Sequence, residues 1–260
     1  MQFSLHRAPG YTVGRVEHDP YKLWQDEEAN AAFVSAWKSI AERYRCISPD
    51  KMGFNLVNEP YSEKAGWRIL SRENHNMVMR KAIEAIRSTG DNRVVFVDGL
   101  NWGRDNLPEL CDMEGVAQSC RAYDPKEITH FSNPDNEVEN TFVQWPDMPG
   151  KEVHTYEKII SWTKQTLFDK FEVWAKMAQE KNVGVHCGEG GVVNTCPRDV
   201  ALSWFRDAME VLDGFNIGFA LWELRGIYGI LDSERKDCKY TDYKGHLLDK
   251  EMLNIMKKGM

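Results

Sequence analysis

Short apolar runs alternate with longer amphipathic segments along the chain. The runs occupy residues 2–5, 52–57, 93–97, 115–120, 183–187 and 217–222. They are almost continuously apolar, a pattern typical of strands that are buried on both faces in a parallel sheet. The pattern therefore predicts six parallel strands.

Between and after these runs, apolar residues recur at helical spacing. The predicted buried faces are Phe33/Trp37/Ile40/Ala41/Tyr44, Met79/Ala82/Ile83/Ile86, Ile160/Leu167/Phe171/Trp174 and Leu202/Phe205/Met209/Leu212. The tail from Leu247 to Met256 is expected to form the last helix. Strands that alternate with helices indicate an α/β fold with a parallel sheet. A closed barrel of this class has eight strands, so six strands predict an incomplete (β/α)8 TIM-type barrel.

Composition and charge fit one large domain. The 260 residues are 42% hydrophobic and contain no linker, so we expect a single domain over 1–260. The net charge of -7 argues against a nucleic-acid partner, which requires a basic face. No apolar run approaches the ~20 residues of a membrane span. The start, "MQFSLHRAPG", lacks the charged and apolar regions of a signal peptide. The sequence does not fix the compartment.

The six cysteines show no C-x-x-C pairing, and a domain of this size does not need disulfides. We therefore expect buried free thiols. The histidines show no metal-ligand spacing, so we expect neither a catalytic metal nor a cofactor.

Polar or aromatic residues follow five of the six apolar runs at their C-terminal ends. They are His6, Asn58 with Glu59, the segment "RAYDP" with Tyr123, Glu189, and Trp222 with Glu223. In α/β barrels the side chains at these strand ends converge on the active site. A glycosidase needs two carboxyl groups beside the scissile bond, and Glu59 and Glu189 fit that pair. The glycines around Glu189 suit either a close approach of substrate to the backbone or a plain turn.

Five segments together resemble glycoside hydrolase family 5, the family that includes many endoglucanases. The segments are "LHRAPGY" (5–11), "FNLVNEP" (54–60), "YDPKEITH" (123–130), "GEGG" (188–191) and "LWELRGIYGILDS" (221–233). The resemblance implies that Glu59 is the acid/base and Glu189 the nucleophile of a retaining reaction. This requires carboxyl groups roughly 5–5.5 Å apart.

The resemblance also implies substrate-binding roles for residues beside the two glutamates. Asn58 would hold the sugar 2-hydroxyl, and Tyr123 would steady the carboxylate of Glu189. Trp222 would form the floor of the cleavage subsite, which His6 would line. Trp102, at another strand end, fits a sugar platform or core packing, and Trp145 in the irregular stretch 123–153 leaves the same two alternatives open.

Two features depart from the family pattern. Arg121 occupies a position where family members usually carry a His, and an Arg cannot replace a neutral imidazole. His130 is a candidate substitute. In addition, "LHRAPGY" corresponds to the third strand of the family's barrel, so two strand–helix units and the Arg that pairs with the nucleophile have no counterpart. The two open sheet edges predict a homodimer or higher oligomer, with plugging by loops or a poorly active fragment as alternatives.

Several alternatives remain open at this point. The favoured activity is endo-β-1,4-glucanase, with mannan or another β-glycan as other substrates. A truncated barrel that binds oligosaccharide without cleaving it is a second hypothesis, and a metal-dependent barrel lyase or isomerase is a third. Glu223 is expected to face away from the cleft, because neighbouring strand residues point to opposite faces. The stretch 234–240, "ERKDCKY", is expected to be a solvated turn.

Overall fold

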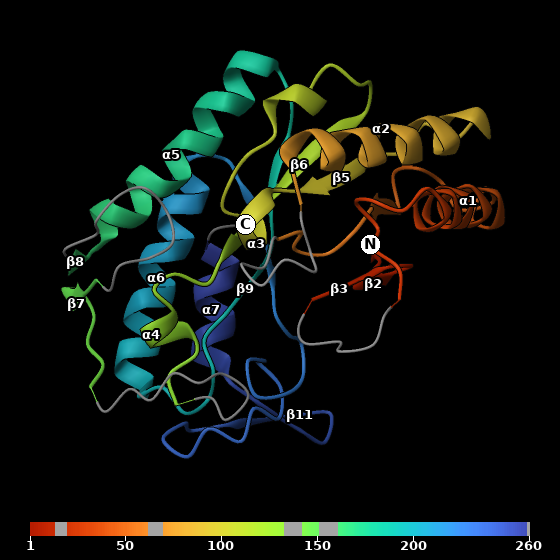
Figure 1. Ribbon diagram of the computed structural model, residues 1–260. Coiled ribbons are helices and arrows are strands. Elements are labelled where there is room, and N and C mark those ends of the chain that lie inside the picture. The colour runs from red at the N-terminus through yellow and green to blue at the C-terminus, as the bar shows by residue number, and fades with distance from the viewer. Residues whose placement is uncertain (14–19, 62–69, 133–141, 151–160, 259–260) are drawn as a thin grey trace. The chain divides into compact units, whose positions relative to one another are not determined.

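The computed structural model describes residues 1–13, 20–61, 70–132, 142–150 and 161–258 (Figure 1). In this part of the chain the main sheet has six strands. In hydrogen-bonded order they are β1 (Gln2–Ser4), β4 (Gly53–Asn55), β5 (Val95–Asp98), β6 (Val116–Ala122), β9 (Val185–Gly190) and β10 (Gly218–Leu221). Each strand lies in or overlaps one of the six apolar runs, and the registered pairs are parallel. The prediction of an incomplete (β/α)8 barrel sheet is therefore confirmed.

The predicted helical faces also form helices. They are α1 (Glu27–Arg43), α2 (Arg72–Ser88), α5 (Lys164–Lys181), α6 (Arg198–Gly214) and α7 (Lys250–Lys258). Ile160, which we assigned to one face, lies outside the described residues. The tail prediction was wrong at its start, because 246–248 form strand β12 (His246–Leu248), which pairs with β11 (Thr241–Tyr243). The helix begins only at Lys250.

The shorter elements connect this framework. They are β2 (Arg7–Ala8), β3 (Tyr11–Thr12), α3 (Leu100–Gly103), the 3-10 helix η1 (Pro108–Leu110), α4 (Lys126–Thr129), β7 (Met148–Pro149) and β8 (Ser161–Trp162). Among the described residues, each helix is too short or too polar to cross a membrane.

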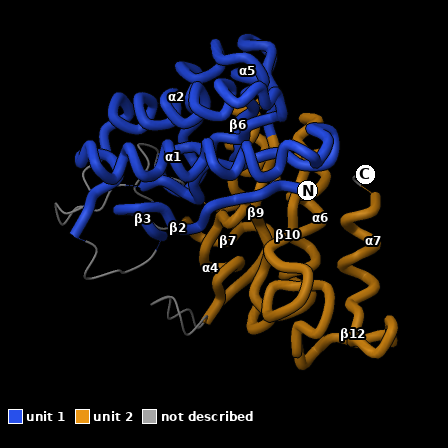
Figure 2. Tube along the Cα trace, turned by 90° about the vertical axis from the view of Figure 1, so that its right-hand side faces the viewer, with its two compact units in different colours: residues 1–120, 177–185 blue, residues 121–176, 186–260 orange. Residues whose placement is uncertain are grey.

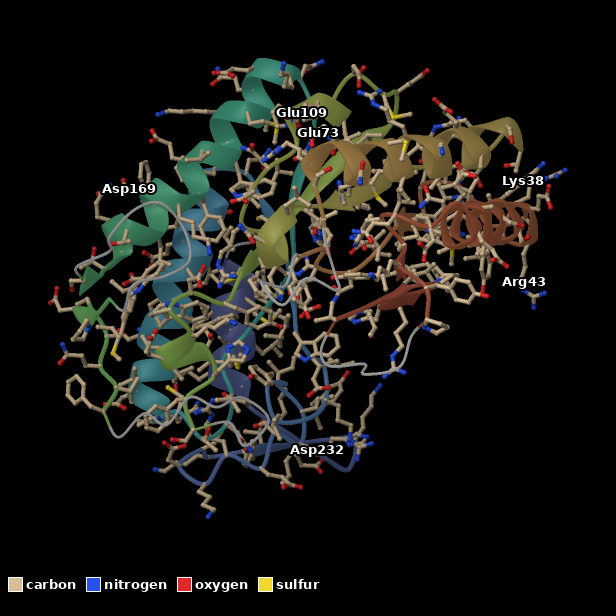
Figure 3. The ribbon with its side chains drawn as sticks, in the orientation of Figure 1. Lys38, Arg43, Glu73, Glu109, Asp169 and Asp232 are labelled. Carbon is tan, nitrogen blue, oxygen red and sulfur yellow. The ribbon has the colours of Figure 1, made fainter. Side chains whose placement is uncertain are left out.

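The chain divides into two compact units, each with its own internal packing (Figure 2). Unit 1 comprises 1–120 and 177–185, and unit 2 comprises 121–176 and 186–260. In unit 1, α1 and α2 pack side by side. Phe33 and Trp37 of α1, Met79 of α2 and Phe54 of β4 belong to one buried core. Lys38 and Arg43 of α1 are exposed (Figure 3).

In unit 2 the core forms around α6. Its apolar face, with Leu202 and Phe205, is buried, as is Trp174 of α5. Trp145 is 8% exposed and its Nε1 donates to Asp207 of α6 at 2.9 Å. Of its two predicted roles, the structure thus supports packing.

All six cysteines are free thiols, but they are not uniformly buried. Cys120, Cys187 and Cys196 are buried, whereas Cys46 is exposed. Burial raises the pKa of the Cys196 thiol to about 12, so this group stays protonated near neutral pH.

Candidate active site

The predicted site residues divide between the two units. His6, Asn58, Glu59 and Trp102 lie in unit 1, and Tyr123, Glu189 and Trp222 lie in unit 2.

In unit 1, the backbone N–H and C=O of Glu59 are both hydrogen-bonded. Its N–H donates to Asp98 Oδ2 at 2.9 Å, and its C=O accepts from the Tyr11 hydroxyl at 2.6 Å. Its φ of 48° is in the left-handed region, which costs a non-glycine residue roughly 1–3 kcal/mol. The two hydrogen bonds hold the residue in this conformation, and the side chain is 8% exposed overall.

The strand before Glu59 is shorter than predicted. β4 ends at Asn55, although the N–H groups of Leu56 and Asn58 still donate to neighbouring segments at 3.2 and 2.9 Å. The strand therefore ends before it reaches Asn58 and Glu59. The Asn58 bond goes to the Leu5 C=O, and it brings the segment of His6 beside Asn58. His6 is exposed and Asn58 is 4% exposed.

Asp98 is a buried carboxylate that sequence reasoning missed. It ends β5 and is 1% exposed. Besides the Glu59 N–H, it accepts a hydrogen bond from Asn55 Nδ2 at 2.6 Å. Asp98 follows the third apolar run directly, so the strand-end rule that selected the other candidates would have found it. Tyr11 could also have been selected, because it is the last residue of the segment 5–11 that carries the family resemblance.

Trp102 packs against unit 1 with one face. Its ring stacks on Tyr61 with centroids 4.5 Å apart and an interplanar angle of 20°. The Arg104 guanidinium lies 5.8 Å from its centroid. Asn101 and Trp102 both have φ near 55°, which forces a tight loop after β5. The ring is partly exposed, so packing holds it in place without enclosing it.

In unit 2, Tyr123 and Glu189 are in direct contact. Tyr123 follows the last residue of β6, and its hydroxyl donates to Glu189 Oε1 at 2.8 Å. Glu189 is the penultimate residue of β9 and is partly exposed. A phenol that donates to a carboxylate stabilises the ionised form. The arrangement suits a carboxylate that must be ionised to act.

The glycines after Glu189 serve close backbone packing. A Cβ on Gly190 would lie 2.8 Å from the Cβ of Ala122 and 2.9 Å from its carbonyl oxygen. A Cβ on Gly191 would lie 2.6 Å from the carbonyl oxygen of Trp222. The Trp222 N–H donates to Gly190 O at 2.8 Å, and the Trp222 side chain is 39% exposed. The glycines therefore let the end of β9 pack closely against neighbouring backbones. This is a third role, besides the close approach of substrate and the plain turn that the sequence suggested.

His130 lies beside Tyr123, as its candidacy requires. Their ring centroids are 5.1 Å apart, and Tyr228 is 5.8 Å from His130 and 6.4 Å from Tyr123. Arg121 is 4% exposed at the end of β6. Glu223 lies over the loop that follows Trp222, where a Cβ on Gly226 would come within 2.1 Å of its Oε1.

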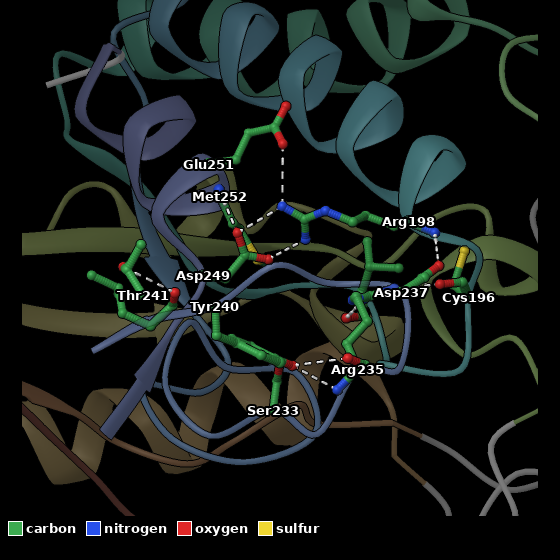
Figure 4. A network of polar contacts seen from close by, with 12 residues as sticks. Cys196, Arg198, Ser233, Arg235, Asp237, Tyr240, Thr241, Asp249, Glu251 and Met252 are labelled. Atoms are coloured by element: carbon green, nitrogen blue, oxygen red, sulfur yellow. Dashed lines mark hydrogen bonds and ion pairs between the residues drawn. The ribbon is translucent and has the colours of Figure 1, made fainter. Parts of the chain in front are cut away.

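The stretch 234–240 is in part the solvated turn that was expected, since Glu234, Lys236, Asp237 and Lys239 are exposed, but Arg235 is buried. Arg235 is 6% exposed and donates to the C=O groups of Cys196 and, at 2.9 Å, Val193 (Figure 4). Its N–H donates to the Tyr240 hydroxyl at 2.7 Å. A single buried guanidinium thus holds the loop that follows Glu189. This role was not predicted, because the charged composition of the stretch indicated an exposed turn.

An ion-pair cluster joins α6 to the start of α7. The Arg198 guanidinium binds both carboxylate oxygens of Asp249 and reaches Glu251 at 3.2 Å (Figure 4). Burial acts to raise the pKa of Asp249, but hydrogen bonds from Arg198 and from the Met252 N–H outweigh it and hold that pKa below its usual range. Asp232, labelled in Figure 3, binds Arg225 Nε at 2.6 Å.

No group of three His, Cys, Asp or Glu side chains suited to a metal ion occurs in the described ranges.

Comparison with known proteins gives one family. The family model for cellulases, glycosyl hydrolase family 5, matches residues 5–226. A crystal structure of a glycoside hydrolase is 34% identical, with a TM-score of 0.88, over all of this chain and 75% of that chain. Endoglucanase C of Acetivibrio thermocellus is 22% identical over 90% of this chain and 70% of its own length.

Thermotoga maritima Cel5A, solved in complex with mannotriose and with cellobiose, shares the fold. Its TM-score is 0.67 at 20% identity, over 90% of this chain and 68% of that chain. The chain therefore belongs to glycosyl hydrolase family 5, the cellulase family, and is a glycosidase.

Proposed function

We propose that the chain is a retaining endo-β-1,4-glucanase whose residues 1–260 form a single catalytic domain. The observation that carries the proposal is the 2.8 Å hydrogen bond from Tyr123 to Glu189. It favours the ionised carboxylate that a nucleophile must present.

In the first step Glu189 attacks the anomeric carbon while Glu59 protonates the leaving glycosidic oxygen. The C–O bond to the leaving sugar breaks, and a glycosyl ester forms on Glu189. The 8% exposure of Glu59 fits an acid/base group that transfers its proton out of contact with bulk water. The two hydrogen bonds to its backbone would hold it ready for the proton transfer.

In the second step Glu59, now ionised, takes a proton from water. The water oxygen attacks the anomeric carbon, and the ester bond to Glu189 breaks. Two inversions at one carbon give net retention. This sequence requires the two carboxyl groups to lie roughly 5–5.5 Å apart.

The remaining predicted residues would bind the sugar. Asn58 holds the 2-hydroxyl, and Trp222, 39% exposed, offers a ring face to the sugar at the cleavage point. His6, which is exposed, lines the same subsite. Trp102, whose ring is held by Tyr61, serves as a platform for a further sugar unit.

Glucan is the favoured substrate because the curated relative is by name an endoglucanase. Mannan is the alternative substrate, since Cel5A of Thermotoga maritima was solved with mannotriose as well as with cellobiose. Parallel turnover of aryl β-cellobioside and aryl β-mannobioside separates the two.

A binding protein without turnover is the second candidate function. The buried Arg121 supports it, because a guanidinium cannot exchange a proton as an imidazole does. Saturable binding of cello-oligosaccharides with no product would favour this alternative.

The test is hydrolysis of an aryl β-cellobioside by the wild type, Glu59→Gln and Glu189→Gln. We expect Glu189→Gln to lose at least about a thousandfold in kcat/KM, because the group that attacks the anomeric carbon is removed. Glu59→Gln should lose about a hundredfold or more in kcat, because hydrolysis of the glycosyl ester needs the general base, whereas an aryl leaving group needs little protonation. Glu223→Gln is the matched control, because Glu223 is a partly buried carboxylate of the same unit that lies over Gly226. Full activity in Glu189→Gln, or an equal loss in Glu223→Gln, would contradict the assignment.

A further inference from the structure

The segment that carries Tyr123 is tied down by a buried hydroxyl. Thr129, the last residue of α4, has no exposed surface. Its Oγ1 lies 2.6 Å from the carbonyl oxygen of Tyr123 and 3.3 Å from that of Pro125. A hydroxyl carries one proton, so the shorter contact takes the donor bond.

The direction of this hydrogen bond determines the tautomer of the neighbouring His130. His130 Nδ1 lies 2.8 Å from Thr129 Oγ1. Because the hydroxyl proton is used on Tyr123, Nδ1 must be the donor in this pair, and neutral His130 carries its proton there. The imidazole ring is thereby oriented with its centroid 5.1 Å from that of Tyr123. One hydroxyl holds both the backbone of Tyr123 and a ring that packs on its phenol.

The backbone of Thr129 also binds the segment that follows Glu189. Its carbonyl oxygen accepts from the Val193 N–H at 3.0 Å, four residues after Glu189. The Val193 C=O in turn accepts from Arg235 at 2.9 Å. Thr129 therefore binds the segment of the phenol and the segment that follows the carboxylate.

Asp124, the residue after Tyr123, is held by contacts that do not involve Thr129. The carbonyl oxygen of Asp124 accepts from Trp204 Nε1 at 3.1 Å, and its carboxylate pairs with Lys170 of α5. Loss of the Thr129 hydroxyl would therefore loosen Tyr123 without releasing the whole segment.

We propose that Thr129 is a positioning residue, which holds the Tyr123 phenol against Glu189 and so maintains the ionised nucleophile. This inference rests on the proposed function, in which Glu189 is that nucleophile. It names a residue that touches neither substrate nor reacting atoms but acts through Tyr123.

Other titratable or charged groups lie on the segments around the pair and could also influence its ionisation. Within the described part of unit 2 they include Arg121, Asp124, His130, Cys187 and Tyr228. The effect of Thr129 that is exerted through Tyr123 must therefore be separated from the effects of these groups. A double-mutant cycle makes this separation.

The test measures the pH profile of kcat/KM on an aryl β-cellobioside for Thr129→Val, Tyr123→Phe and the double variant. Valine has nearly the shape of threonine and carries a methyl group in place of the hydroxyl. Loss of one hydrogen bond to the carboxylate should raise the apparent pKa of the acid limb by about one unit in Tyr123→Phe, and Thr129→Val should shift it in the same direction by less. The double variant should match Tyr123→Phe, and Thr129→Ser, which keeps the hydroxyl, should match the wild type.

An unshifted acid limb in Thr129→Val, or a shift that persists in the Tyr123→Phe background, overturns the inference. If Thr129→Val does not fold, Thr129→Ala takes its place in the cycle. Glu189→Gln is measured alongside, and retained activity in that variant refutes the proposed function and this inference together. An inactive Glu189→Gln with additive Thr129 and Tyr123 effects refutes the inference alone.

Discussion

A buried histidine in unit 1 makes folding stability depend on pH. His75 of α2 has no exposed surface, and its ring lies 5.2 Å from that of Trp24. Its Nδ1 contacts Asn76 Oδ1 at 3.1 Å, whereas Nε2 has no hydrogen-bond partner among the described residues. Burial disfavours the charged imidazolium and lowers the pKa of His75 from 6.5 to about 4.

The sign and size of the effect follow from this shift. Below pH 6.5 the unfolded chain takes up a proton that the folded protein refuses until about pH 4, so acidification favours unfolding over this window. The full penalty, reached below pH 4, is about 3 kcal/mol for a pKa lowered from 6.5 to about 4. Between pH 7 and pH 5, His75 should cost about 2 kcal/mol of the free energy of unfolding.

The perturbation is His75→Phe, which keeps a planar ring but cannot titrate. Urea denaturation at pH 7 and pH 5 gives the free energy of unfolding of the wild type and the variant. The wild type should lose about 2 kcal/mol more than the variant over this interval. Equal losses in the two proteins, or an NMR titration of the His75 ring with a midpoint near pH 6.5, would refute the reasoning.

Three further predictions concern the support of the site and the state of the molecule. Arg235→Met removes the buried guanidinium that donates to the carbonyl groups of Val192, Val193 and Cys196 and should lower the free energy of unfolding by about 3 kcal/mol. Urea denaturation checks this value, with no loss as the contradicting result. Gly191→Ala should cost roughly 1–3 kcal/mol, because its Cβ would meet the Trp222 carbonyl at 2.6 Å. Gly214→Ala, with nothing within 4 Å, is the matched control and should be neutral or slightly stabilising. Light scattering of the purified chain should give a dimer or larger species, because β1 and β10 end the order of the sheet. An active monomer would show that association is not required.

The sheet and helices could be predicted from the sequence because they depend on local periodicity. Each apolar run contained or overlapped its strand, and each helical face with described residues formed a helix. The tail was assigned wrongly at Leu247, because "HLL" fits a strand and a helix equally well when its pairing partner, β11, is unknown.

Within the site, residues at strand ends were predictable and the residues that support them were not. Glu59 and Glu189 could be selected from their positions, and Asp98 could have been selected by the same rule. The role of Arg235 depends on carbonyl groups some forty residues earlier in the chain, which no local pattern reveals. The close packing of Gly191 on Trp222 is likewise a long-range contact.

The central claim is that Glu189 is the nucleophile and Glu59 the acid/base. Azide added to Glu189→Gly and Glu59→Ala with an activated aryl β-cellobioside tests both roles, with the products identified by NMR. Without the nucleophile, azide attacks the anomeric carbon once and should give the α-glycosyl azide. Without the acid/base, the ester on Glu189 still forms and azide displaces it, which should give the β-glycosyl azide. The same anomer from both variants, or no azide product from either, would contradict the account.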